Sequence, residues 1–368
     1  MKRQLLGVAA ILLSISTYAQ DNPLWMRYCA ISPDGTTIAF TYKGDIYTVP
    51  STGGRASQIT TNPAHDTKPI WSPDGKKIAF ASDRMGSMDI FEVNKEGGIP
   101  KRLTTHSGNE TPVAYKDAGH ILFLANIMPT VEDAQFPSGQ FQQVYEVNTE
   151  GGRPILFSSM PMEDISINHT GNTLLYHDKK GYEDPWRKHH TSSITRDIWL
   201  CSLNGNRTFR KQTAFNGEDR TPVWASDDKS FYYLSEEKGS FNIFKRDIDG
   251  NTSKQITNHT KHPVRFLSAA SNGTLCYGYD GEIYTVKEGA IPQKVQISIV
   301  TDKNDKDLIR QIKRSGATEI SLSPDAKEIA FVLRGDVYVT STEYSTTKQI
   351  TNTPQQERDI HFSPDGRS

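Results

Sequence analysis

The sequence predicts an all-β fold: a six-bladed β-propeller of four-stranded antiparallel blades, followed by the start of a second, truncated propeller. Residues 71–104 contain four short apolar or β-branched runs separated by turn residues, which indicates a meander of four strands. The first turn of this unit, Ser-Pro-Asp-Gly at 72–75, suits a type I turn. It recurs at 32–35 and 363–366 and, with Ala in place of Gly, at 323–326.

The end of the fourth strand recurs together with the turn. Its copies are Gln58-Ile59-Thr60, Arg102-Leu103-Thr104, Lys211-Gln212-Thr213, Gln255-Ile256-Thr257 and Gln349-Ile350-Thr351. In the second strand, Ile78 and Phe80 alternate with Ala79 and Ala81, so both faces of the sheet are apolar. A sheet that is apolar on both faces needs similar sheets on either side, and such a repeat is typical of a β-propeller.

The chain begins with a predicted secretory signal peptide at residues 1–20. Lys2 and Arg3 precede a short apolar run, and Ala19 provides a small residue for cleavage before Gln20. We therefore expect an exported protein, periplasmic or secreted, with no membrane span once the signal is removed. An uncleaved membrane anchor is the alternative.

Six units follow and are expected to close a ring within residues 21–300. We place them at 28–61, 69–104, 112–147, 165–200, 222–257 and 264–297, the last ending in a fourth strand over Lys294–Ile297. The third unit carries an insertion at 126–142 and the fourth another at 178–195. The second is expected to be a surface loop, with contact to a partner or a neighbouring domain as the alternative; no role is assigned to the first.

A charged segment at 301–316 is predicted to be a linker, with one helical turn or more left open. The repeat then restarts at Glu319 and runs to Thr351, and another unit opens with a strand at 359–362. Residues 317–368 are therefore expected to form the first blades of a second propeller. Because a blade cannot end after one strand, we expect the chain to be the front part of a longer protein.

Composition and cysteine spacing point to a soluble, β-rich protein without special chemistry. The 42 Lys and Arg residues balance 43 Asp and Glu residues, which gives no sign of nucleic acid or membrane as a partner. Cys29, Cys201 and Cys276 are widely spaced and odd in number, so we predict buried thiols instead of a disulfide framework or a metal site.

No catalytic, cofactor-binding or metal-binding residue is predicted, and no cofactor is implied. The sequence has no nucleophile elbow, zinc-protease motif or phosphate-binding glycine loop. The acidic residues of the repeated turn are interpreted as turn formers instead of acid catalysts; they are Asp34, Asp74 and Asp365. His189 and His190, near His177 and Asp178, could suggest a metal site. Neighbouring side chains on extended backbone point in opposite directions, so this pair cannot easily share one metal ion.

Several stretches carry a resemblance to a known family. These are residues 30–35 with 42–47, 70–75 with 81–84, and 334–338 with 357–366. On these residues the chain resembles the N-terminal part of tricorn-type serine proteases, in an exported form, over nearly all of the expected mature chain. TolB-like propellers share the single repeat, but the order of six units, a charged linker and a new Arg-Gly-Asp-Val-Tyr strand resembles the tricorn family.

The resemblance implies a six-bladed propeller, then a seven-bladed one, a PDZ-like domain and a serine peptidase core. The family's catalytic residues lie in the later domains, so none is carried over to positions 1–368. The implied role is non-catalytic: guiding peptides or unfolded polypeptide to and from the downstream protease domains of the same chain. A homo-oligomer is compatible with this role. The alternatives are a TolB-like cell-envelope propeller that binds proteins and the propeller cap of a prolyl-oligopeptidase-like enzyme.

Overall fold

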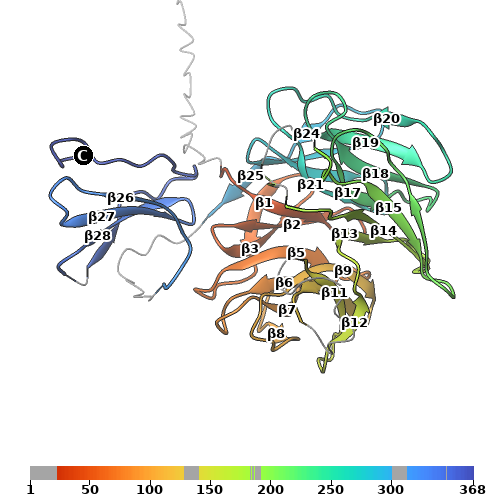
Figure 1. Ribbon diagram of the computed structural model, residues 1–368, viewed down its shortest axis with the longest axis horizontal. Helices are drawn as coiled ribbons and strands as arrows, with labels where there is room; N and C mark the ends of the chain where they lie inside the picture. The colour runs from red at the N-terminus through yellow and green to blue at the C-terminus, as the bar shows by residue number, and fades with distance from the viewer. Residues whose placement is uncertain are drawn as a thin grey trace, which may run out of the picture.

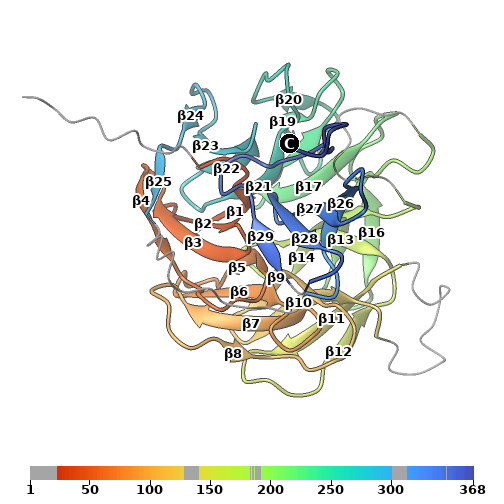
Figure 2. The same ribbon diagram turned by 90° about the vertical axis from the view of Figure 1, so that its left-hand side faces the viewer.

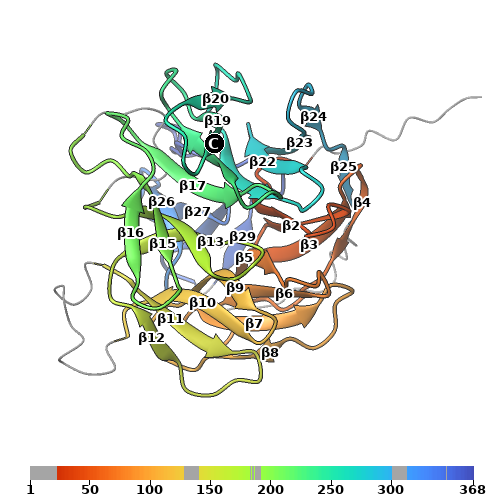
Figure 3. The same ribbon diagram turned by 90° about the vertical axis from the view of Figure 1, so that its right-hand side faces the viewer.

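The computed structural model describes residues 23–127, 141–182, 184, 186, 192–300, 313–344 and 346–368. Within these residues every regular element is a β-strand, and the strands form seven sheets (Figure 1). Six sheets surround one axis as blades, and the seventh lies over one face of this ring (Figures 2 and 3). The predicted six blades of four antiparallel strands, followed by a further sheet of the same kind, are therefore confirmed, and blade 1 carries one additional parallel strand. The described residues include no helix that is long and apolar enough to cross a membrane.

Each blade begins at the axis and adds strands outward in chain order. Blades 1 and 2 consist of β1 (Arg27–Ile31), β2 (Thr37–Tyr42), β3 (Asp45–Pro50) and β4 (Gly54–Gln58), then β5 (Asp66–Trp71), β6 (Lys77–Ser82), β7 (Asp89–Asn94) and β8 (Lys101–Arg102). Blades 3 and 4 consist of β9 (Thr111–Asp117), β10 (His120–Ala125), β11 (Gln143–Asn148) and β12 (Ile155–Ser158), then β13 (Met162–Ile167), β14 (Thr173–Asp178), β15 (Ile198–Ser202) and β16 (Thr208–Lys211). Blades 5 and 6 consist of β17 (Asp219–Trp224), β18 (Ser230–Ser235), β19 (Asn242–Asp247) and β20 (Ser253–Gln255), then β21 (Arg265–Ala269), β22 (Leu275–Tyr279), β23 (Glu282–Val286) and β24 (Gln293–Lys294).

The repeated Ser-Pro-Asp-Gly turn is held by its own side chains. The Ser72 hydroxyl donates to Asp74 at 2.7 Å and accepts from the backbone N–H of Lys77 at 2.9 Å. The hydrogen bond from Ser72 is the main reason that the pKa of Asp74 lies below its usual value. Equivalent serine-to-aspartate bonds join Ser32 to Asp34, Ser323 to Asp325 and Ser363 to Asp365. The prediction that these aspartates are turn formers is confirmed.

The recurring Thr at the end of the fourth strand also has a structural role. Its hydroxyl accepts a hydrogen bond from the backbone N–H at the start of the third strand, as Thr104 does from Ile90 at 2.9 Å. Thr60, Thr213, Thr257 and Thr351 make the same bond to Ile46, Ile198, Ile243 and Val337. The bond satisfies a donor that fourth-strand pairing leaves open, which explains why Thr recurs there.

The core lies between the blades. In β6, Ile78 and Phe80 contact blade 1, whereas Ala79 on the other face packs against blade 3. All three side chains are 0% exposed. The expectation that both faces of a blade are covered is therefore confirmed for blade 2.

The ring closes differently from the prediction. The expected fourth strand at Lys294–Ile297 is divided: β24 ends at Lys294, and β25 (Ile297–Ile299) crosses to blade 1, where it pairs in parallel with β4. Gly53 permits this approach, because a Cβ at that position would lie 2.6 Å from the carbonyl oxygen of Gln296. The crossing strand joins the last blade to the first and makes blade 1 a five-stranded sheet.

The three cysteines are buried and free, as predicted. Cys29 of blade 1 and Cys276 of blade 6 belong to one apolar cluster at the junction that closes the ring. Burial, followed by the hydrogen bond to the Cys29 thiol, raises the pKa of the Cys276 thiol. Both thiols therefore act as packing groups at this junction.

The seventh sheet consists of β26 (Ala317–Leu322), β27 (Glu328–Leu333), β28 (Asp336–Ser341) and β29 (Thr347–Gln349). The strand expected at 359–362 is not formed, because no neighbouring strand pairs with it, although the turn at 363–366 is made. Residues 301–312 of the expected linker lie outside the described residues. The sheet meets blade 1 through Lys43, whose Nζ is 3.4 Å from Asp336 Oδ2.

Candidate functional site

The innermost strand of five blades contains one residue in the left-handed region of backbone space. They are Tyr28 (φ 52°), Lys68 (φ 54°), Asp164 (φ 48°), Thr221 (φ 52°) and Phe266 (φ 56°). In each of these strands the pairing register shifts across this residue, so it forms a β-bulge. Each lies four positions before the residue that begins the turn to the second strand.

The bulge is unfavourable for residues with a side chain, and it recurs here without glycine. A left-handed conformation costs a non-glycine residue about 1 kcal/mol or more, so surrounding structure has to maintain it. In blade 3 the equivalent residue is Pro112, whose ring prevents a positive φ; a register shift still follows it directly, between Pro112 and Ala114. We call these six positions the collar: Tyr28, Lys68, Pro112, Asp164, Thr221 and Phe266.

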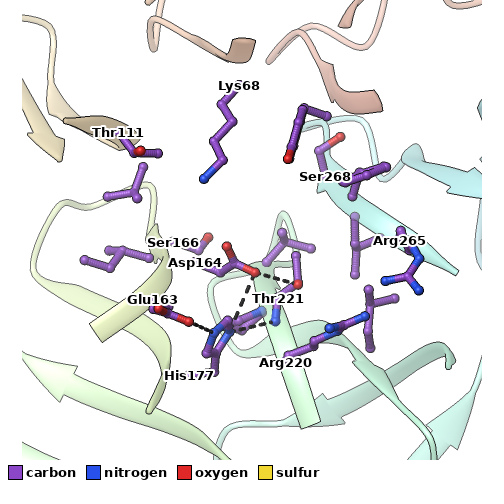
Figure 4. Close-up of a pocket in the computed structure, with 18 of the residues that line it drawn as sticks. Lys68, Thr111, Glu163, Asp164, Ser166, His177, Arg220, Thr221, Arg265 and Ser268 are labelled. Atoms are coloured by element: carbon purple, nitrogen blue, oxygen red, sulfur yellow. Dashed lines mark hydrogen bonds and ion pairs between the residues drawn. The ribbon is translucent and has the colours of Figure 1, made fainter. Parts of the chain in front are cut away.

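The collar surrounds a cavity of about 690 Å³ on the axis of the ring. All six collar residues line it, and each blade contributes its innermost strand. Figure 4 shows Lys68 extending from one wall into the cavity, with Asp164 and Thr221 on the opposite wall. A cavity bounded by every blade is a property of the closed ring and of no single repeat.

The collar is chemically uneven around its circumference. Tyr28 and Phe266 form an aromatic pair with ring centroids 4.8 Å apart. The Nζ of Lys68 lies 5.8 Å from the Tyr28 ring. Thr221 Oγ1 donates to Asp164 Oδ2 at 2.6 Å. One side is therefore aromatic, one is cationic and one is anionic.

A network of charges forms the cavity wall on blades 4 and 5. Glu163 accepts a 2.7 Å hydrogen bond from Lys179 Nζ and lies 3.2 Å from His177 Nε2. Burial by itself would raise the pKa of Glu163, but the hydrogen bonds and charges of His177 and Lys179 outweigh it and hold that pKa well below its usual value. Arg196 extends the network to Glu218, at 2.9 Å.

His177 is held between partners on both sides of its ring. Its Nδ1 lies 3.3 Å from the backbone N of Thr221 and 3.6 Å from Asp164 Oδ2, and its Nε2 lies 3.2 Å from Glu163 Oε2. The ring therefore connects Glu163 to Asp164 and orients this wall of the cavity.

Alternating arginine and tryptophan side chains extend from the cavity to the seventh sheet. Arg265, which lines the cavity, lies 5.1 Å from the Trp186 ring and donates to its carbonyl oxygen at 2.6 Å. Arg27 lies 4.9 Å from the Trp186 ring and 5.3 Å from that of Trp25. Arg358, beyond the seventh sheet, lies 5.2 Å from the Trp25 ring. We call these five residues the Arg–Trp ladder.

The insertion at 178–195 is exposed at Tyr182 and Trp186, as expected of a surface loop. These two residues and Asp184 also line the cavity, so this part of the insertion contributes to the candidate site. The aromatic and charged residues of this insertion were the only sign in the sequence of a role beyond that of a loop. In the structure, Trp186 is positioned by its contacts with Arg27 and Arg265. His189 and His190 lie outside the described residues, as do most of the residues at 126–142. Among the residues that are described, no group of three His, Cys, Asp or Glu side chains could hold a metal ion.

The sequence reasoning did not identify the collar. A signal was present: aligned on their turns, five of the six repeats place a polar or aromatic residue at this position, directly before an apolar one. Lys68 and Asp164 could have been found as charges inside otherwise strand-like runs. The direction of these two side chains depends on the β-bulge, and the pattern of apolar and polar residues does not reveal a bulge.

Comparisons with known proteins agree with this architecture. Residues 23–290 match the model of the tricorn protease N-terminal β-propeller domain. "Tricorn protease homolog 1" of Streptomyces coelicolor is 25% identical over 90% of this chain and 30% of its own length. "Tricorn protease homolog" of Saccharolobus solfataricus is 26% identical over 76% of this chain and 26% of its own length.

A crystal structure of the tricorn protease shares the fold, with a TM-score of 0.62 and 19% identity over 90% of this chain and 31% of that protein. The matches therefore span between about a quarter and a third of the length of these tricorn relatives. From the six four-stranded blades and the match over residues 23–290, the chain belongs to the tricorn N-terminal β-propeller family.

Proposed function

We propose that this chain is the non-catalytic front part of a tricorn-like serine peptidase, and that its axial cavity holds peptide chains on their way to or from a protease core. The observation that carries the proposal is the cavity of about 690 Å³ bounded by all six blades. Its lining combines aromatic, cationic and anionic side chains, as a site for polypeptide of varied sequence requires.

The protease core would lie in a part of the protein beyond residue 368, in keeping with relatives three to four times as long as their matched segment. The partners in this proposal are unfolded polypeptides and the peptidase domains of the same protein, with assembly into a homo-oligomer compatible with it. Export, to the periplasm or outside the cell, is part of the proposal and depends on the predicted signal peptide at 1–20.

The test compares one labelled polypeptide in its unfolded form, after reduction and alkylation, with the same polypeptide folded. Binding to the 368-residue chain is followed by fluorescence anisotropy. We expect the unfolded form to bind and the folded form not to bind, because only an extended chain fits into the cavity. Thr111 lines the cavity, and Thr111→Trp should weaken binding about tenfold by filling it.

Thr252→Trp is the matched control, because Thr252 is exposed on the turn between β19 and β20 and does not line the cavity. Thermal unfolding of both variants verifies that the ring is intact. Equal binding of the folded and unfolded forms, or equal binding by both variants, would refute the cavity as the peptide site.

A further inference from the structure

The collar places two opposite charges across the axis. In a ring of six blades, blade 2 faces blade 5, so Lys68 faces Thr221 and the Asp164 carboxylate bonded to it. Figure 4 shows the Lys68 side chain extended toward this pair with open space between them. Asp164 is 47% exposed at its side chain, and that surface faces the cavity.

The Lys68 ammonium has no hydrogen-bond or ion-pair partner among the residues that the structure describes; its one neighbour of note is the face of the Tyr28 ring. Burial lowers its pKa, while the negative charges of Asp164 and Glu163 oppose this change. Lys68 is half-buried and lines the cavity, so its ammonium is open to a ligand there. It is also held on a left-handed bulge that presents it to the cavity.

We propose that Lys68 and Asp164 together bind the main chain of an extended polypeptide, the ammonium donating to a peptide carbonyl and the carboxylate accepting from a peptide N–H on the opposite edge. This inference rests on the proposed function and adds the chemical group that is recognised. A peptide backbone carries an acceptor and a donor on opposite edges, which matches a cation and an anion on opposite walls.

The carboxylates of Asp164 and Glu163, whose charges act on Lys68, would repel a third carboxylate bound to its ammonium. Lys179 acts in the opposite direction, and Arg220 and Arg265 also line the cavity, so the experiment includes a charged ligand as a separate outcome. Tyr28, Phe266 and Pro112 complete the collar with apolar surface that can accept side chains of many kinds. The collar would therefore hold extended chains with little regard for sequence.

The experiment measures binding of a fluorescent peptide to the 368-residue chain by anisotropy. The peptide is uncharged, lacks proline and is capped at both ends. We expect Lys68→Met to weaken binding about tenfold or more, because a hydrogen bond to a charged group is lost. Lys68→Arg should retain most of the affinity. Lys229→Met is the control, since Lys229 is an exposed lysine on the β17–β18 turn and its variant should bind as the native chain does.

A second probe separates the two sides of the collar. An oligomer of sarcosine has peptide carbonyls but no N–H groups. Lys68→Met should weaken its binding, whereas Asp164→Asn should weaken binding of the ordinary peptide and leave that of the sarcosine oligomer unchanged. In the Asp164→Asn variant the amide oxygen can still accept from Thr221, so the variant preserves the wall while removing the charge.

Three outcomes distinguish a failure of the proposed function from a failure of the collar inference. If no peptide binds the native chain, the proposed function itself is wrong. If peptides bind but Lys68→Met and Lys229→Met behave alike, the cavity binds peptides and the collar inference alone is wrong. If Lys68→Met weakens only peptides with a free carboxylate, at the C-terminus or on an acidic side chain, then Lys68 is an anion site and the main-chain assignment is overturned.

Discussion

The tripeptide Ile-Ala-Phe occurs twice in the ring, at 38–40 and 78–80, and once in the seventh sheet, at 329–331. In the ring all six side chains are 0% exposed, whereas in the seventh sheet Ala330 is 7% exposed and its two neighbours are only half-buried. On the adjoining strand Ile320 is 72% exposed. The same residues thus form the same strand in both places, and only the ring has a blade on each side to cover it.

Contacts within a sheet are alike in the two regions. Phe80 stacks on Phe91 across the strand pair with ring centroids 6.1 Å apart, and Phe331 stacks on Tyr338 at 5.6 Å. The difference lies between sheets, where Phe80 also belongs to an apolar cluster shared with blade 1. Most of the stability of a blade should therefore come from its neighbours, as in other repeat architectures.

The largest expected effect tests that difference directly. Phe80→Ala should lower the free energy of unfolding by about 3–5 kcal/mol, because it opens a cavity in a fully buried core. Phe331→Ala, with the same chemistry in the seventh sheet, should cost only about 1 kcal/mol. Urea unfolding followed by tryptophan fluorescence measures the first, and hydrogen exchange of the β27 amides measures the second. Equal losses of stability in the two variants would contradict the claim that neighbouring blades supply most of the stability of a blade.

An intermediate effect concerns acids that the ring encloses. Burial is the main reason that the pKa values of Asp45, Glu110 and Asp219 rise to about 7. Between an unfolded pKa near 4 and these values, the native state binds more protons than the unfolded state, so the free energy of unfolding falls as pH rises and levels off above 7. The slope should be about 1 kcal/mol per pH unit for each group.

Asp219→Asn should make the pH dependence of the free energy of unfolding less steep by about 1 kcal/mol per pH unit, because one of the three buried acids no longer titrates. Urea unfolding at several pH values between 5 and 8 measures this slope. The corresponding position in the seventh sheet is Ala317, which is exposed and cannot titrate. Ala317→Asp is therefore the matched control and should leave the pH dependence unchanged. A slope that survives in Asp219→Asn would show that burial in the ring is not its source.

The smallest effect concerns the connection between the two regions. Arg358→Ala removes one contact of the Arg–Trp ladder, whose free energy should be about 0.5–1 kcal/mol at an exposed site. We expect faster proteolysis of residues 313–368 and no change in the thermal unfolding of the ring. Arg367→Ala is the control, because the Arg367 side chain is exposed and makes no contact with the described part of the ring. Equal proteolysis of the two variants would mean that the ladder does not hold the seventh sheet.

Much of the fold could be predicted from the sequence because it depends on contacts close along the chain. The turn at 72–75 and the second strand that follows it use hydrogen bonds and side-chain alternation within a few residues. The hydrogen bond between Thr104 and Ile90 spans 14 residues, and the same bond is made in five sheets. The recurring Thr was therefore visible in the sequence, although the bond that it makes was not. Interactions this close along the chain are formed again in every repeat that contains the same residues.

The candidate site could not be predicted in the same way. Lys68 and Asp164 are 96 residues apart in the sequence and face each other only because six blades close a ring. Trp186 belongs to an insertion without repeat character, and its position depends on arginines of blades 1 and 6. Strand β25 left its expected place because the outer edge of blade 1 offered unpaired backbone groups.

The sequence by itself determined the blade: four strands, their turns, their capping Thr and the apolar faces that require neighbours. Only the tertiary structure decided which bulge residues meet at the axis, how the ring closes and where the insertion of blade 4 lies. The physical reason is the range of the interactions involved. Hydrogen bonds within turns and side-chain alternation are settled within one repeat, whereas an axial cavity and a closing strand exist only after the first and last blades have met.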